Sequence, residues 1–261
     1  MPKHWAHLTS RELDALASRE PVAALVLGAI EQHGPHLPLA TDCIIGEALL
    51  AAAAAQLEDA FPLLVLPTFT LGASEEHARF AGTLSCTAGQ LHRQLLALGE
   101  GLSRSGLRRL VLVNAHGGNI GWMESGALAL RRAFGMLVVK ASYMRFAAPV
   151  DLVAAEELRD GLHGGLAETA MMRHLAGELV HMAHAEDFVP RHRHDQPLPP
   201  QGEAPWAWLA EDLHEAGVVG DAASATAELG EKLVAHYAGR LADVIRACRD
   251  KPWQPVDGRG R

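Results

Sequence analysis

The stretch VAALVLGAIEQHGPHLPLATD, residues 22–42, decides the fold of this chain. Its first seven residues are continuously apolar and rich in Val and Leu, which is typical of a strand buried on both faces of a sheet. A polar loop with two prolines follows, and this part of the stretch carries Glu31, His33 and Asp42. We therefore expect a buried strand whose carboxyl end opens directly into a group of metal-capable side chains.

The same succession of strand, polar loop and helix runs through the first half of the chain. Further apolar runs predict strands at 63–67, 109–114 and 136–141. This alternation indicates βαβ units around a mostly parallel sheet, and therefore the α/β class. The loops after Gly28, Pro67 and Asn114 leave the carboxyl ends of their strands, so we expect them to meet at one edge of the sheet.

Capping residues mark the expected helix starts. Thr9 with Glu12, and Thr87 with Gln90, match the capping-box pattern, in which two side chains satisfy the free N–H groups of the first turn. Asn119 is expected to cap the helix that follows the third strand.

The second half of the chain is less regular. Helices are predicted at 151–158, 166–176 and 222–248, with a long proline-rich loop at 185–205. Because no internal repeat or linker divides the sequence, we expect residues 1–261 to form a single domain.

Composition excludes several functional classes. The net charge of -8 argues against nucleic acid or an anionic membrane as the main partner. Cys43, Cys86 and Cys248 form no CxxC pair, which favours reduced thiols in a cytoplasmic protein. The first residues lack the apolar segment of a signal peptide, and no apolar run has the length of a membrane span. We therefore expect a cytoplasmic protein without a membrane partner.

The group Glu31, His33 and Asp42 has two interpretations. Residues two apart on an extended backbone point to the same side, so Glu31 and His33 can face one site, to which Asp42 returns after the prolines. Two carboxylates and an imidazole suit a first-row divalent ion such as Zn, Mn or Fe. Alternatively, the loop is solvated and Asp42 only caps the next helix; these residues alone favour neither interpretation.

The segment NAHGGN places His116 just beyond the third strand, at the same expected edge. Gly117 and Gly118 permit a close backbone approach or a positive φ. A phosphate-binding loop is the alternative, but neither GxxxxGK[ST] nor GxGxxG follows any strand. A second alternative is that His116 is an incidental histidine in a turn. The shared edge favours His116 as a metal ligand.

Two further segments carry candidate residues. In GLHGGLAET, His163 and Glu168 taken alone fit a surface loop and a helix-start charge better than a site. Glu75, Glu76 and His77 fit ligands, substrate contacts or a solvated turn equally; we assign His77 and Gly117 to substrate binding. The histidines of RHRHD, residues 191–195, are expected to be exposed.

Taken together, the loops supply enough carboxylates and imidazoles for two metal ions. A binuclear site needs about five ligands with one shared carboxylate, and we expect Asp42 to be the shared one.

The motifs EQHGPHLPLATD, NAHGGN and LHGGLAET resemble those of the creatininase (creatinine amidohydrolase) family, in order and spacing, over residues 20–245. SEEHARFAGTLS resembles a further family segment. The resemblance implies a three-layer α/β/α fold, two divalent ions (Zn, Mn or Fe) and a homohexamer. It also implies that Glu31 and His116 bind one ion, that His33 binds the other, that Asp42 bridges them, and that His163 is catalytic.

The chain departs from creatininase at two places. Creatininase has Tyr-Glu where this chain has Gly117 and Gly118, and that glutamate is a ligand. Glu168 is the nearest replacement, as the HGGN-type branch of the family would require. Asp160, Gly161 and Leu162 stand where creatininase has an aromatic wall, so creatinine is not the expected substrate.

These observations predict a metal-dependent amidohydrolase. We expect hydrolysis of a linear or cyclic C–N amide bond of a small molecule, other than an ordinary peptide bond. A hydroxide bridging two divalent ions would attack, and His163 would move the proton. One alternative is a peptidase that matures a cofactor precursor. Another is a non-catalytic small-molecule or nucleotide-binding module that uses the Gly117–Gly118 loop.

Overall fold

The computed structural model describes residues 2–191 and 198–254. Its centre is a five-stranded sheet in the order β1-β3-β2-β4-β5, in which every neighbouring pair is parallel. The strands are β1 (Lys3–His4), β2 (Val22–Leu27), β3 (Leu63–Val65), β4 (Arg109–Asn114) and β5 (Leu137–Ser142). The predicted parallel sheet is confirmed.

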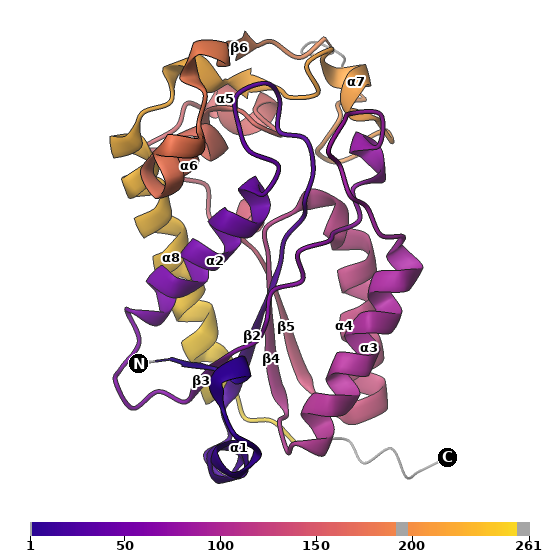
Figure 1. The fold of residues 1–261 in the computed structure, drawn as a ribbon, viewed down its shortest axis with the longest axis vertical. Coiled ribbons are helices and arrows are strands. Elements are labelled where there is room, and N and C mark those ends of the chain that lie inside the picture. The colour runs from indigo at the N-terminus through magenta and orange to yellow at the C-terminus, as the bar shows by residue number, and fades with distance from the viewer. Residues whose placement is uncertain (1, 192–197, 255–261) are drawn as a thin grey trace.

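Helices cover both faces of the sheet, so the fold has three layers, α/β/α (Figure 1). One face carries α2 (Thr41–Ala54), α6 (Leu166–Ala176) and α8 (Ala227–Asp250), and the other carries α3 (Ala88–Arg104) and α4 (Ile120–Phe134). The shorter helices are α1 (Ser10–Ala17), α5 (Ala155–Asp160) and α7 (Ala210–Leu213). Among the described residues, no helix is long and apolar enough to cross a bilayer.

Strand β2 shows why its sequence is apolar throughout. Val22, Ala24 and Val26 face the core under α2, α6 and α8. The alternate residues, Ala23, Leu25 and Leu27, face the core under α3 and α4. None of the six is more than 1 % exposed, so both faces of the strand exclude polar side chains.

Both predicted capping boxes form. Thr9 accepts a hydrogen bond from the backbone of Glu12 at the start of α1, and Thr87 does the same with Gln90 at the start of α3. The cap predicted for Asn119 is wrong, although α4 does begin after this residue. Its amide instead donates to the Gly28 carbonyl and accepts from the backbone N–H of Ala73, so it joins three loops.

The carboxyl ends of β2 and β4 lie side by side, since Leu27 pairs with Asn114. The long loop from β2 to α2 extends beyond this edge, where α5, α7 and strand β6 gather at the same end of the molecule (Figure 1). A small antiparallel sheet of β6 (Asp187–Phe188) and β7 (Gly220–Asp221) lies there. These two-residue strands and β1 were not predicted, because they are too short to carry a sequence pattern.

Short 3-10 helices carry several residues of this edge. Three of them matter for the site: η2 (Glu75–His77), η3 (Gly117–Asn119) and η4 (Tyr143–Arg145). The others are η1 (Trp5–His7), η5 (Gly177–Leu179), η6 (Met182–His184) and η7 (Ala222–Ser224).

Candidate active site

Five predicted ligands converge at the carboxyl edge of the sheet. Glu31 and His33 come from the loop after β2, Asp42 from the first turn of α2, His116 from the loop after β4, and Glu168 from the first turn of α6. The first four are at most 4 % exposed, and the Glu168 side chain is 16 % exposed. Carboxylates this deeply buried need a positive partner.

Asp42 takes part in two groups of ligand atoms. In one, His116 Nδ1 lies 3.2 Å from Glu31 Oε1 and 3.3 Å from Asp42 Oδ2. In the other, His33 Nε2 lies 3.3 Å from Asp42 Oδ1 and 4.0 Å from Glu168 Oε2. Within each group the candidate ligand atoms lie within 4.8 Å of one another. Each oxygen of Asp42 thus faces a different group, which is the arrangement expected of a shared ligand.

Backbone hydrogen bonds fix the two imidazoles in the tautomers that a metal requires. His116 Nε2 is 2.9 Å from the Ala73 carbonyl and must donate to it, which leaves a lone pair on Nδ1 in the neutral ring. His33 Nδ1 is 3.2 Å from the Glu31 carbonyl and in the same way leaves a lone pair on Nε2. Both lone pairs point at carboxylate oxygens, so acceptors face acceptors.

The buried polar atoms of the site confirm this mismatch. Within the described residues, Glu31 Oε1 and Oε2, His33 Nε2 and Asp42 Oδ2 have no hydrogen-bond partner. Orphaned buried acceptors are costly, at about 1–3 kcal/mol each and more for charged groups. Cations placed among them would satisfy all of these atoms, so the donor set fits divalent metal ions.

Without metal ions, protons serve as the cations. Burial would lower the pKa of His33, but Asp42 raises it to about 9. Burial would likewise lower the pKa of His116, yet Glu31 raises it well above its usual value. Burial would raise the pKa of Glu31, but His116 holds it well below the normal range. Metal binding therefore has to displace protons from the two imidazoles.

Glu168 is held in place by two donors. The backbone N–H of Gly164 donates to Oε2 at 2.7 Å, and the Tyr143 hydroxyl donates to Oε1 at 3.2 Å. Gly164 has a φ of +64°, which favours glycine, and its turn joins His163 to α6. The same turn therefore positions both Glu168 and His163.

His163 and His77 lie beside the ligand groups. The His163 ring is 4.3 Å from both the His33 and the His77 ring. His163 Nδ1 lies 3.8 Å from Glu31 Oε1, and His77 Nε2 lies 3.5 Å from the same oxygen. Burial, followed by the neighbouring His33, lowers the pKa of His163, and burial lowers that of His77 to about 3. Both rings are therefore neutral near pH 7.

Gly118 has no room for a side chain. A Cβ there would lie 2.5 Å from Glu76 Oε1 and would overlap the carbonyl oxygen of Ala73. The Glu76 carboxylate lies 3.7 Å from His116 Nε2, on the side of the ring away from Glu31 and Asp42. Glu76 therefore fills the space beside Gly118 without joining the ligand groups.

Gly117 is different from Gly118. Among the described residues beyond its chain neighbours, no heavy atom would come within 4 Å of a Cβ at this position. It is exposed, and leaves open space beside His116. His192 and His194, from the RHRHD segment, lie outside the described residues.

The sequence did not reveal several residues that hold the site. Gln32 is 5 % exposed and contacts both His77 and His163. Tyr143 supports Glu168, and Asn119 fastens the loop that carries Ala73. The only signal for Gln32 was its position between two predicted ligands, and alternation along an extended backbone would have pointed it away from them.

Comparison with known proteins assigns the family. The family model "Creatininase: Creatinine amidohydrolase" matches residues 6–245. A mycofactocin precursor peptide peptidase of Mycobacterium tuberculosis (strain ATCC 25618 / H37Rv) is 33% identical over 256 residues, covering 95% of this chain and 92% of the relative. A creatinine amidohydrolase of Pseudomonas putida is 30% identical over 258 residues, covering 92% and 94%.

Solved structures agree with this assignment. A mutant creatininase superposes with a TM-score of 0.80 at 25% identity, covering 96% of this chain and 100% of that one. A manganese creatininase gives a TM-score of 0.76 at 27% identity, covering 94% and 98%. The fold, the family model and the relatives agree along nearly the whole chain, which therefore belongs to the creatininase family of amidohydrolases.

Proposed function

We propose that this chain is a two-metal hydrolase that cleaves an amide C–N bond. One observation carries the proposal: buried acceptor atoms of Glu31, His33 and Asp42 face one another without hydrogen-bond partners within the described residues. A structural core does not retain such an arrangement, because each orphaned atom costs free energy.

The proposed ligand set follows the two groups of atoms. Glu31 and His116 hold one ion, His33 and Glu168 hold the second, and Asp42 is shared. Glu168 supplies the carboxylate that Gly118 lacks. The ions are Zn, Mn or Fe; among the similar structures, one is a manganese creatininase and another is a mutant of Zn-Zn type.

The chemistry divides between the ions and the chain. Divalent ions bound at these ligands would act as Lewis acids and supply hydroxide near neutral pH. His163 Nδ1 carries no proton in the neutral ring and faces the same centre, so it can accept a proton and deliver it to the leaving nitrogen. His77 and Gly117 contact the substrate. Burial of Glu31 and Asp42 excludes bulk water from the reacting centre.

Two substrate classes follow from this site. The first is a small-molecule amide, linear or cyclic, other than creatinine. The second is a peptide, and it is favoured by the mycofactocin precursor peptide peptidases, which are 32–33% identical against 30% for the creatinine amidohydrolase. The open space beside Gly117 suits either class. We further propose a single-domain, cytoplasmic enzyme that assembles as a homohexamer, as the family resemblance implies.

Metal analysis and a substrate panel test this proposal. The purified chain is reconstituted with Zn, Mn or Fe, its metal content is measured, and cyclic amides, formamides and short peptides are assayed for hydrolysis. We expect about two ions per chain and an activity that a chelator abolishes. Retention of a small ligand that is insensitive to chelator, without hydrolysis, would instead identify a binding module.

Asp42→Asn is the decisive variant, with Glu47→Gln as its control on the same helix. Glu47 is exposed and accepts a hydrogen bond from Thr68 at 2.6 Å, away from the ligand groups. Because Asp42 is shared, its loss should remove both ions and reduce hydrolysis by at least about 100-fold, since even partners one shell beyond the ligands cost about 10–100-fold. Unchanged metal content in Asp42→Asn would refute the assignment.

A further inference from the structure

The side-chain amide of Gln32 has only one possible orientation. The backbone N–H of Gly34 donates to Gln32 Oε1 at 2.9 Å, and Gln32 Nε2 donates to the Gly217 carbonyl at 2.6 Å. A backbone N–H can only donate and a carbonyl can only accept, so the two ends of the amide cannot be exchanged. Gln32 therefore presents a fixed N–H group to its other neighbours.

That N–H group determines the tautomer of His77. Gln32 Nε2 lies 2.8 Å from His77 Nδ1 and has one hydrogen left after bonding Gly217. His77 Nδ1 must accept it, so a neutral His77 carries its own proton on Nε2. This Nε2–H points toward Glu31 Oε1, at 3.5 Å.

Gln32 also orients His163, but here the unprotonated nitrogen faces Glu31. His163 Nε2 lies 2.9 Å from the backbone carbonyl of Gln32 and must donate to it. The lone pair on Nδ1 then faces Glu31 Oε1, at 3.8 Å. The 3.3 Å approach of Gln32 Nε2 to His163 Nε2 brings two donors together and is not a hydrogen bond in this arrangement.

We propose that Gln32 is a positioning residue that gives the two histidines complementary roles at one carboxylate. Through its side chain it makes His77 a hydrogen-bond donor, available to an oxygen of the substrate. Through its backbone it makes His163 a proton acceptor. These roles in amide hydrolysis rest on the proposed function, whereas the two tautomers are properties of the chain alone.

Nitrogen NMR of the histidine rings tests the tautomers directly. The full chain is labelled with 15N in its imidazoles, loaded with zinc, and measured by solid-state NMR, with signals assigned from His77→Asn and His163→Asn. We expect both rings to be protonated on Nε2 and unprotonated on Nδ1. Protonation of His77 on Nδ1 in the unmodified protein would overturn the proposal.

The Gln32→Glu variant separates the effect of the Gln32 side chain on His77 from the effect of its backbone on His163. A carboxylate can only accept, so His77 should move its proton to Nδ1, whereas His163, whose partner is a backbone carbonyl, should not change. Gln32→Met removes the donor without adding a charge, and should leave His77 as a mixture of tautomers. Gln90→Glu, at the N-terminal cap of α3, is the control and should alter neither ring. If His77 keeps its Nε2 proton in both Gln32 variants, Gln32 does not position it.

Kinetics add a second measurement once a substrate is known. We expect Gln32→Glu to lower kcat by about 10–100-fold, with a small change in KM, because a misplaced proton affects the chemical step more than binding. The NMR result does not depend on turnover. Absence of hydrolysis would therefore reject the proposed function, whereas an unchanged His77 tautomer would reject the role of Gln32.

Discussion

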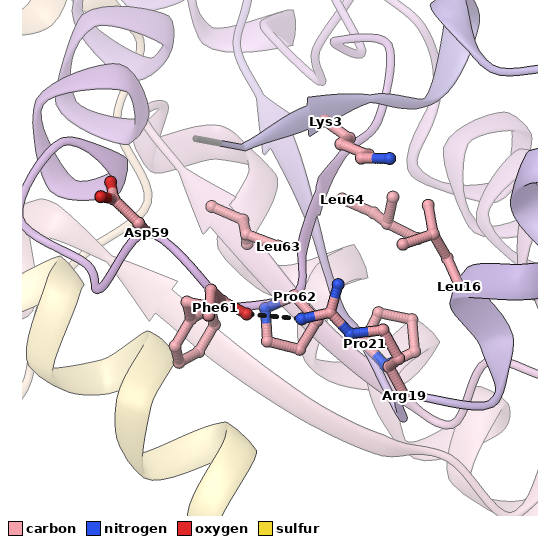
Figure 2. A pocket seen from close by; sticks show the side chains of 10 residues that line it. Lys3, Leu16, Arg19, Pro21, Asp59, Phe61, Pro62, Leu63 and Leu64 are labelled. Atoms are coloured by element: carbon pink, nitrogen blue, oxygen red, sulfur yellow. Dashed lines mark hydrogen bonds between the residues drawn. The ribbon is translucent and has the colours of Figure 1, made fainter.

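The two ends of the central sheet differ in whether their polar groups have hydrogen-bond partners within the described residues. At the amino end, a cavity of about 80 Å³ lies among Lys3, Leu16, Arg19 and the segments that enter β2 and β3 (Figure 2). Arg19 donates to the Ala60 carbonyl there at 2.7 Å. At the carboxyl end, by contrast, buried acceptors of Glu31, His33 and Asp42 have no hydrogen-bond partner among the described residues.

The two ends therefore differ in whether their polar groups find partners within the described residues. The cavity at the amino end has an exposed arginine that is hydrogen-bonded within the chain. The carboxyl end offers an arrangement that only a cation can complete.

Glu168→Gln should disrupt the proposed metal site at the carboxyl end most selectively. An amide is a much poorer metal ligand than a carboxylate, so we expect one of two ions to be lost, with hydrolysis reduced at least about 100-fold. The ion at Glu31 and His116 should remain. Metal analysis of the variant measures this, and two retained ions would show that Glu168 is not a ligand.

Lowering the pH should destabilise the metal-free chain through His36. Burial lowers the pKa of this fully buried histidine from 6.5 to about 4, so the unfolded chain binds its proton more readily than the folded one. The contribution of neutral His36 to the free energy of unfolding is complete above pH 6.5. It is lost as the pH falls from 6.5 to about 4, and the loss amounts to at most about 3 kcal/mol. Urea unfolding at several pH values measures this, and His36→Gln should show a shallower dependence.

Gly118→Ala should destabilise the folded chain by about 1–3 kcal/mol, because the new Cβ would overlap the Ala73 backbone and the Glu76 carboxylate. Gly117→Ala is its control, since a Cβ at that position meets open space. Thermal unfolding of the two variants provides the comparison. Equal stabilities would mean that the 73–76 segment can move aside.

Arg19→Ala tests the amino end and should have the smallest effect. Its exposed side chain gives up one hydrogen bond to Ala60, so we expect a change within about 0.5 kcal/mol and unaltered metal content. A loss of activity comparable to that of Glu168→Gln would overturn the contrast between the two ends.

The regular elements were the most predictable part of the fold. Strand 109–114 and helix 166–176 begin and end where the sequence indicated, because each has a continuous pattern bounded by polar or glycine residues. The predicted helix at 222–248 instead begins at Ala227, since the preceding residues pair as β7 and turn as η7. Tertiary contacts determined that boundary.

The candidate site was predictable where its residues directly follow a strand. Glu31, His33 and His116 lie at the expected edge because the end of each strand fixes their position. The proximity of Glu168 to His33 depends on how α6 packs near α2, which no local pattern records. Gln32 was missed, and the role of Glu76 stayed open, for the same reason: their partners are loops far away in the sequence.

The close approach of Ala73 and Glu76 to Gly118 has an evolutionary consequence. A glutamate at position 118 and the present course of the 73–76 segment exclude each other, because both need the same space beside His116. A glutamate therefore cannot be introduced at position 118 by a single substitution while the 73–76 segment keeps its present course. Such a change has to move the loop as well, so we expect position 118 and the 73–76 segment to vary together among relatives.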